Sequence, residues 1–183
     1  MLIAFTAYQW LCYAYVLWRD VNIPVKPQIF GGPWTCIKTD LVAAYFKFFN
    51  TALKNKPFKR VYIDAFAGSG AFRYIEDTPA VSLFGPRDAS LDIHPGSAQR
   101  ALSVQPGFDR IIFIEKKRNN VKQLEALIRE SGHPAATVEQ GDCNHVLSQL
   151  CRRAAWRKSR GVIFLDPFGM KVDWSTLEWQ LSP

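Results

Sequence analysis

Four short apolar runs alternate with amphipathic segments between residues 61 and 166, and this alternation restricts the chain to few folds. Two of the runs, 111–114 and 162–165, are apolar at every position, which is typical of strands buried on both faces of a sheet. Strands that alternate with helices predict a parallel sheet with helices on both sides. The sequence therefore predicts an α/β fold with a doubly wound, mostly parallel sheet of about four strands.

The predicted elements can be placed from the spacing of their apolar residues. In chain order, strands are expected at 61–63, 110–115, 136–140 and 161–166, and helices at 39–54, 97–104, 119–131 and 144–156. Thr39 can cap the first helix and Ser97 the second, and Gly132 follows the end of the third.

A chain of 183 residues is long enough for one domain. Residues 1–29 are expected to be an apolar N-terminal extension with a Pro/Gly linker, and residues 30–183 the α/β domain. The first eighteen residues carry no charge. We expect them to form an apolar helix packed on the domain or a leader without function. A membrane anchor is the less favoured alternative, because eighteen residues are short for a span.

The formal net charge of +7 favours an anionic partner, for which RNA or DNA is the usual candidate, although a merely basic soluble enzyme is an equal alternative. The basic residues within 152–160 are interpreted as a solvated helix face, with a phosphate-contacting patch as the second interpretation. The four cysteines lack CxxC spacing, and no histidine stands at zinc-ligand spacing. We therefore expect a cytoplasmic protein with reduced thiols and no metal.

Carboxylates stand at the ends of the predicted strands. Asp64, Glu115 and Asp166 end three of them, and Asp142 lies just past the fourth. In an open parallel sheet the ligand crevice lies beyond the carboxyl ends of the strands. The sequence therefore predicts a ligand site with several acids at one edge of the sheet.

The loop "AGSGAF" after the first strand narrows the class of ligand. It lacks the Gly-Lys-Ser/Thr ending of a P-loop, and no helix is expected directly behind it, so a phosphate cradle is poorly supported. S-adenosylmethionine carries a sulfonium and an ammonium, which favour nearby carboxylates, and ribose hydroxyls, which donate to them. The acidic edge fits that cation better than a polyphosphate.

Each acid also has a purely structural interpretation, and the residues leave it open. Asp64 with its glycines can be a plain strand-to-loop turn, and Glu115 a solvated strand end paired with the following basic residues. Asp142 can cap the next helix, and Asp166 with Pro167 can form a turn.

The motifs "DAFAGSG", "IFIEK", "GDCN" and "LDPFG" resemble those of class I S-adenosylmethionine-dependent methyltransferases. More closely, "FGGPWTCIKTDLVAAYFKFFNTAL", "YIDAFAGSG", "GSAQRAL" and "GVIFLDPFGMKVDWSTLE" resemble the three-Cys-motif partner protein family, TcmP. The resemblance covers about residue 30 to the end of the chain. It implies a Rossmann-like fold, S-adenosyl-L-methionine as cofactor and a three-Cys-motif protein as partner.

The resemblance also implies cofactor-binding roles. The first motif would consist of Asp64, Phe66, Gly68 and Gly70, with the glycines letting the backbone approach the methionine part and Asp64 orienting that part directly or through water. Glu115 would accept from the ribose hydroxyls. Asp142 would accept from the adenine amine, with the backbone of Cys143 nearby.

The implied catalytic residues are Asp166, Pro167 and Phe168, which occupy the place of the Asp/Asn-Pro-Pro-Tyr/Phe motif of amino-group methyltransferases. There the acid and a carbonyl bind the target amine, and the aromatic ring stacks on the base. The second proline of the motif is absent from this chain, which leaves the acceptor amine unidentified.

Two functions are therefore expected from different classes. The first is a methyltransferase acting on an amino group of a nucleic acid base. The second is a non-catalytic subunit of methyltransferase fold that works in complex with a three-Cys-motif protein. The class I fold has seven strands in the order 3-2-1-4-5-7-6. With four predicted strands before Pro183, we expect a truncated member whose fourth strand is left as an edge.

Overall fold

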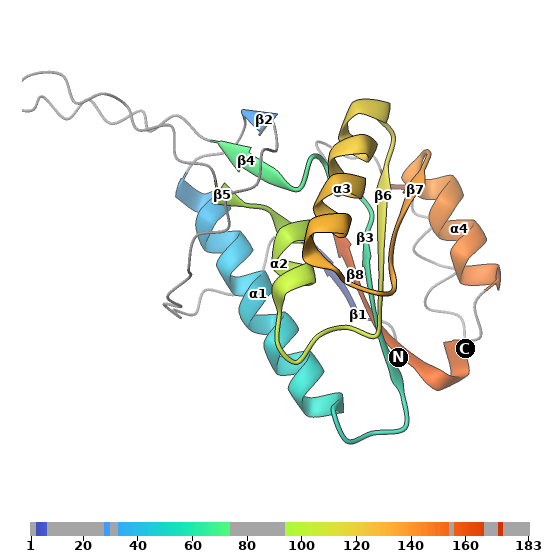
Figure 1. Cartoon of the computed structure of the whole chain (residues 1–183). Coiled ribbons are helices and arrows are strands. Elements are labelled where there is room, and N and C mark those ends of the chain that lie inside the picture. Colours follow the sequence, from blue (N-terminus) through green and yellow to red (C-terminus); the bar gives the residue numbers. More distant parts are fainter. Residues whose placement is uncertain are drawn as a thin grey trace, which may run out of the picture.

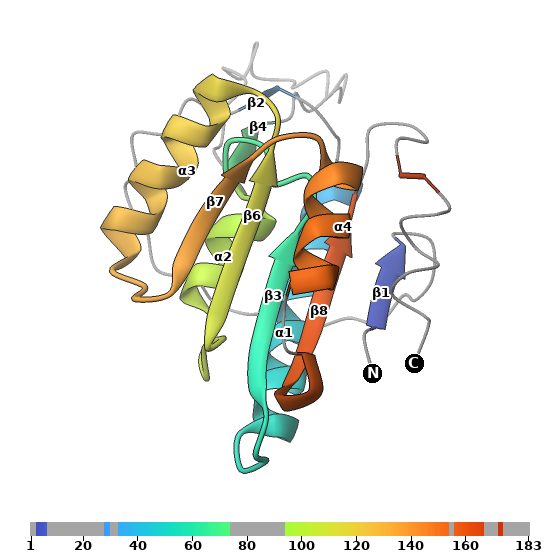
Figure 2. The ribbon, with the colours of Figure 1, turned by 90° about the vertical axis from the view of Figure 1, so that its right-hand side faces the viewer.

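A central parallel sheet organises the protein. The computed structural model describes residues 3–6, 28–29, 33–73, 94–153, 156–166 and 172–173. Five strands form the sheet, in the order β1 (Ile3–Thr6), β8 (Ser159–Leu165), β3 (Lys59–Asp64), β6 (Arg110–Glu115) and β7 (Ala136–Gln140). All neighbouring pairs are parallel (Figure 2). The α/β fold with a parallel sheet is confirmed, and its four predicted strands stand in the order 3-2-1-4.

Helices cover both faces of this sheet. Figure 1 shows α1 (Pro33–Leu53), α2 (Ser97–Ser103) and α3 (Arg118–Ser131) on one side and α4 (Cys143–Arg153) on the other. A short 3-10 helix (Trp156–Lys158) leads into β8. Gly132 ends α3 in the left-handed conformation, with φ 63°, as its position predicted.

Successive side chains on each strand point to opposite faces of the sheet, so the strands contribute to two apolar cores, one on each face. Tyr62 on β3 and Phe113 on β6 point to the core that α1, α2 and α3 cover. Val61 and Ile63, the neighbours of Tyr62 on β3, point to the opposite core, where Leu147 of α4 covers them. Both faces of these strands are therefore buried, and the one polar side-chain group in the centre of β3, the Tyr62 hydroxyl, donates to Asp64.

The N-terminal segment differs from the expectation for it. Residues 3–6 were expected in a helix or a leader outside the domain, but they form β1, which pairs with β8 from Ile3 opposite Val162 to Thr6 opposite Leu165. The fourth predicted strand is therefore not an edge, since β1 occupies the place beside it. A strand suits residues 3–6 because its backbone N–H and C=O groups can form hydrogen bonds with β8.

Two helix starts were also predicted wrongly. Helix α1 begins at Pro33 rather than Thr39, since a proline at the first helical position lacks only an N–H that has no intrahelical acceptor. Ser97 does not cap α2. Gly96 holds the cap position, and the Ser97 hydroxyl donates elsewhere.

A second, three-stranded sheet was not predicted. It consists of β2 (Gln28–Ile29), β4 (Ala71–Arg73) and β5 (His94–Pro95), with β4 in the middle. Residues 28–29 were expected to belong to a linker. Because β4 follows the glycine loop directly, a strand and not a helix stands behind that loop.

The described helices include none that is long and apolar enough to cross a membrane. The remainder of the apolar N-terminal stretch lies outside the described residues, as do Pro167 and Phe168. The domain boundary at residue 30 stays a prediction.

Candidate functional site

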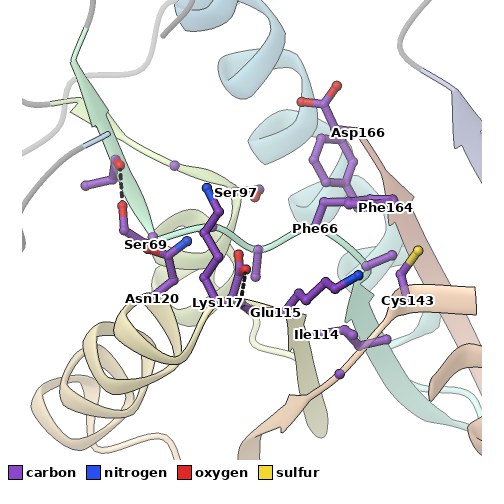
Figure 3. A pocket seen from close by; sticks show the side chains of 18 of the residues that line it. Phe66, Ser69, Ser97, Ile114, Glu115, Lys117, Asn120, Cys143, Phe164 and Asp166 are labelled. Atoms are coloured by element: carbon purple, nitrogen blue, oxygen red, sulfur yellow. Dashed lines mark hydrogen bonds between the residues drawn. The ribbon is translucent and has the colours of Figure 1, made fainter. Parts of the chain in front are cut away.

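A cavity of about 550 Å³ lies across the carboxyl ends of β3, β6, β7 and β8. This volume is within the range of small-molecule sites. Figure 3 shows side chains from these strand ends and from helices pointing into it. The lining includes seven of the predicted site residues, namely Phe66, Gly68, Gly70, Glu115, Asp142, Cys143 and Asp166. The structure therefore brings together residues that the sequence separates by up to a hundred positions.

The glycine loop forms one wall of the cavity. Gly68 and Gly70 have φ of 62° and 88°, which only glycine adopts at little cost. The Ser69 hydroxyl donates to the Ala71 carbonyl at 2.9 Å, and the Gly96 N–H donates to the Gly70 carbonyl at 3.0 Å. A Cβ on Gly96 would lie 2.8 Å from the Gly70 oxygen. The loop is thus fixed by hydrogen bonds and by the absence of side chains at three positions.

Asp64 lies beneath this loop and does not line the cavity. Its carboxylate is fully buried and accepts from the Ser97 hydroxyl at 2.6 Å, the Tyr62 hydroxyl at 2.9 Å and the Phe66 N–H at 3.2 Å. Ser97 and Phe66 both line the cavity, so Asp64 holds two of its walls in place. The predicted contact of Asp64 with a cofactor stays a prediction.

Burial raises the pKa of Asp64 to about 6, although the three hydrogen bonds that it accepts favour the ionised form. Burial also raises the pKa of Tyr62 well above its ordinary value, with the Asp64 charge as a second cause. Tyr62 therefore stays protonated and donates.

The raised pKa of Asp64 predicts a pH dependence of stability. Asp64 contributes to the free energy of unfolding because its pKa is higher in the folded than in the unfolded protein. This contribution is fully present below the unfolded-state pKa of 3.8, and it is lost as the pH rises through about 6. The loss is about 3 kcal/mol. In urea unfolding, Asp64→Asn removes this loss, because a neutral amide can accept from Phe66 and donate to the two hydroxyls. Between pH 4 and pH 7 the free energy of unfolding of the wild type should therefore fall by roughly 2 kcal/mol relative to that of the variant, because part of the loss already occurs below pH 4.

Asp109→Asn is the control for that experiment. The hydrogen bond from Arg60 lowers the pKa of Asp109, so its contribution is present at neutral pH and is lost on acidification. This variant should lose stability relative to the wild type between pH 4 and pH 7. Parallel pH curves for the wild type and Asp64→Asn would contradict the assignment.

Glu115 ends β6 at the middle of the cavity. Its Oε1 accepts from the Lys117 N–H at 2.7 Å, and its carbonyl accepts from the Gly141 N–H at 3.1 Å. The side chain is half-buried, so the carboxylate retains free acceptor sites toward the cavity. The alternative interpretation paired Glu115 with the basic residues that follow it, but Lys116 Nζ lies 3.7 Å from Asp142 Oδ2 instead.

Asp142 caps α4. Its Oδ1 accepts from the Asn144 N–H at 3.1 Å, and its carbonyl accepts from the Val146 N–H at 3.0 Å. The structural interpretation of Asp142 is thus realised, yet the residue also lines the cavity, so the two interpretations are compatible. Cys143 follows at the start of α4, and burial raises the pKa of its thiol.

Asp166 follows the end of β8, and Lys38 of α1 reaches it. Lys38 Nζ lies 2.5 Å from Asp166 Oδ2, with the two side chains 31% and 34% exposed. An ion pair at this exposure is worth about 0.2–1 kcal/mol, so a competing donor can displace it.

Sequence reasoning missed several residues of the site. Gly96, Ser97, Asn120 and Lys38 contribute to the cavity or to its acids, and Asn120 is 7% exposed. No local signal marked Asn120, because the equally polar Asn119 beside it in the first turn of α3 is exposed. In the described part of the chain, no group of three or more His, Cys, Asp or Glu side chains could hold a metal ion.

The four predicted strands stand in the order 3-2-1-4 in a parallel sheet, with a glycine loop after β3 and a cavity across the carboxyl ends, which defines a Rossmann-like α/β fold. The solved structures that are similar to this chain include the following two. The "Putative methyltransferase yhhF" of Escherichia coli matches with a TM-score of 0.51 and 19% identity, over 90% of this chain and 68% of that one. Protein LPL1258 of Legionella pneumophila, family-model DUF519, matches with a TM-score of 0.50 and 18% identity, over 72% and 57%.

No family model and no curated protein matches the sequence. At these identities the two structures show the fold alone. The present chain spans 57% of the Legionella protein and 68% of the Escherichia coli protein.

Proposed function

We propose that the protein is an S-adenosylmethionine-dependent methyltransferase that acts on an amino group of a nucleic acid base. The observation that carries the proposal is the cavity itself, where a glycine loop and three carboxylates meet at the strand ends of a methyltransferase-like fold. The proposed location is cytoplasmic. The proposed family is that of the three-Cys-motif partner proteins, which rests on the motifs in the sequence.

The residues present fit the proposed cofactor. All five residues line the cavity: Gly68 and Gly70 would leave room for the methionine part, Glu115 would offer acceptors to ribose hydroxyls, and Asp142 with Cys143 would hold the adenine ring. The acids also attract a sulfonium and an ammonium. When bound, the cofactor supplies an electrophilic methyl group.

The chain's own residues would bind and orient the acceptor. Asp166 stands at the end of β8 beside the loop after β3, so its carboxylate can accept a hydrogen bond from an amine at the cavity. Binding the amine would replace Lys38 as its partner. Rate enhancement would come mainly from this positioning. Pro167 and Phe168 are proposed to contribute a carbonyl and a stacking ring.

One observation favours a second function. The acid proposed to bind the acceptor is ion-paired with Lys38 in the isolated chain, which suits a subunit that binds cofactor and is completed by another protein. A three-Cys-motif protein is the proposed companion. Because the ion pair is weak, the two functions can be separated by experiment.

Isothermal titration calorimetry with S-adenosylmethionine tests the cofactor, and transfer of labelled methyl groups to total RNA and to DNA tests the reaction. Binding with transfer by the chain alone supports the first function. Binding with transfer only after a three-Cys-motif protein is added supports the second. Absence of measurable binding by the folded protein rejects both.

Glu115→Gln should weaken binding of S-adenosylmethionine by about 1–3 kcal/mol, because hydrogen bonds to a charged acceptor are lost. Titration calorimetry measures the change. Glu125→Gln, at an exposed position of α3 away from the cavity, is the matched control and should leave the affinity unchanged. An effect of Glu115→Gln below a few tenths of a kcal/mol would identify Glu115 as a solvated strand end.

A further inference from the structure

A second, basic groove lies at the opposite end of the sheet from the candidate site. It has a volume of about 530 Å³ and is formed by the turn between α1 and β3 and by the 3-10 helix before β8. Figure 2 shows this turn and the 3-10 helix together at the lower end of the strands. We define the basic groove by its lining residues Lys54, Lys56, Pro57, Phe58, Lys59, Arg60, Asp109 and Lys158.

The charges of the groove are only partly compensated. Arg60 and Asp109 form a two-pronged ion pair, with Nη2 to Oδ1 at 2.8 Å and Nε to Oδ2 at 2.9 Å, so they neutralise each other. The four lysines of the groove are exposed, and within the described residues none of them has an ion pair. Lys59 also interacts electrostatically with Asp109, but the lining residues as a set keep four net positive charges, which suit an extended anion.

An aromatic residue lies among these lysines. Phe58 lines the groove and is half-buried, and the Arg160 guanidinium lies 3.8 Å from its ring centroid. Stacked guanidinium and aromatic planes are surfaces on which a nucleic acid base can stack. Lysines interleaved with an aromatic side chain are the pattern of sites for single-stranded nucleic acid.

We propose that the basic groove binds the sugar-phosphate backbone of single-stranded nucleic acid. A lipid surface fits less well, because the large exposed apolar residues of the described chain are Ile37 and Phe48, and neither lines the groove. An acidic protein would use the lysines but not the stacked Phe58 and Arg160. The observations therefore favour nucleic acid.

The position of the groove separates it from any chemistry at the cavity. Lys59 and Asp64 are the two ends of β3, which at 3.3 Å per residue places the two sites about 17 Å apart. A strand contacting both must extend over several nucleotides. The groove would add affinity without taking part in a reaction, so the inference stands whether or not methyl transfer is found.

The test is fluorescence anisotropy of a labelled 20-nucleotide single-stranded RNA as a function of salt. The variant is Lys54→Gln, Lys56→Gln and Lys158→Gln together. Each phosphate contact on a single strand contributes about 0.7 to the slope of log K against log salt, so the slope should fall by about 2. If the two proteins bind equally near 1 M salt, the variant then binds about 100-fold more weakly at 0.1 M salt.

The matched control replaces Lys47, Lys122 and Arg129 by glutamine, which removes the same charge from exposed positions outside the groove. It should keep the wild-type slope to within about one contact. Circular dichroism melting checks that both triple variants are folded. We expect that they are, because all substituted positions are exposed.

Several results overturn the proposal. One is a groove variant whose slope of log K against log salt equals that of the wild type. Another is a control variant whose slope falls as much as that of the groove variant, because binding would then depend on net charge alone. A third is that vesicles of phosphatidylglycerol bind the wild type but not the groove variant, while the two proteins bind RNA equally. The groove would then face a membrane. If polyglutamate displaces the RNA at equal charge concentration, the groove is a site for an acidic protein.

Discussion

We expect Gly68→Val to abolish binding of S-adenosylmethionine while the protein stays folded. Gly68 lines the cavity with φ 62°, a conformation that a β-branched residue avoids. The loop must therefore change its path, and the new side chain occupies space at the cavity wall. Titration calorimetry should show a loss of at least 100-fold in affinity. Circular dichroism melting should show a protein that is folded but less stable by about 1–2 kcal/mol, the strain of one residue in the left-handed conformation.

Gly132→Val is the matched control for this result. Gly132 has φ 63°, and a Cβ built on it meets nothing within 4 Å, so the backbone strain is the same without any contact to the cavity. It should lower stability by a similar amount and leave the affinity unchanged. Gly70→Val is less informative, because its Cβ would lie 2.7 Å from Leu127 Cδ2 in the core. Wild-type affinity in a folded Gly68→Val protein would remove the glycine loop from the cofactor site.

Asp166→Ala should lower the turnover of methyl transfer by 100-fold or more and change the affinity for S-adenosylmethionine by less than threefold. The reason is that its proposed partner is the acceptor amine and not the donor. Single-turnover transfer to the nucleic acid accepted in the assay measures the first quantity, and titration calorimetry the second. The assay uses the chain together with any companion protein that transfer requires.

Asp166→Asn separates the proposed role from a structural one. The amide keeps one acceptor oxygen and the size of the side chain, so it should retain more turnover than alanine. Lys38 loses its ion partner in both variants, so a role of Asp166 that is confined to that pair would make them equal. Equal turnover in the two variants, or an unfolded Asp166→Ala protein, would show that Asp166 is a structural residue.

Much of the fold follows from local patterns. The apolar run at 111–114 and the run at 162–165 required burial on both faces, and the structure buries them between two cores. The order 3-2-1-4 was expected from the methyltransferase resemblance. Neither β1 nor the small sheet could be predicted, because two- to four-residue strands carry too few positions for a period to show.

The acids of the site were placed correctly at the strand ends, because strands that run in parallel must bring these ends to one edge. Their partners were not predictable in the same way. Ser97 reaches Asp64, and Lys38 reaches Asp166, across 33 and 128 positions of sequence. Such pairs depend on how helices dock on the sheet, and no local pattern encodes it.

The pairing of β1 with β8 joins segments from nearly opposite ends of the described chain. Closing so long a loop costs conformational entropy before any contact is gained, and the segments that separate the other paired strands, β3, β6, β7 and β8, are shorter. We expect β1 to be the last strand to dock. During synthesis on the ribosome the segment Ile3–Thr6 is made before β8 exists, so its backbone has to wait unpaired. The edge of β8 opposite β3 is therefore open to other strands until Ile3–Thr6 docks on it.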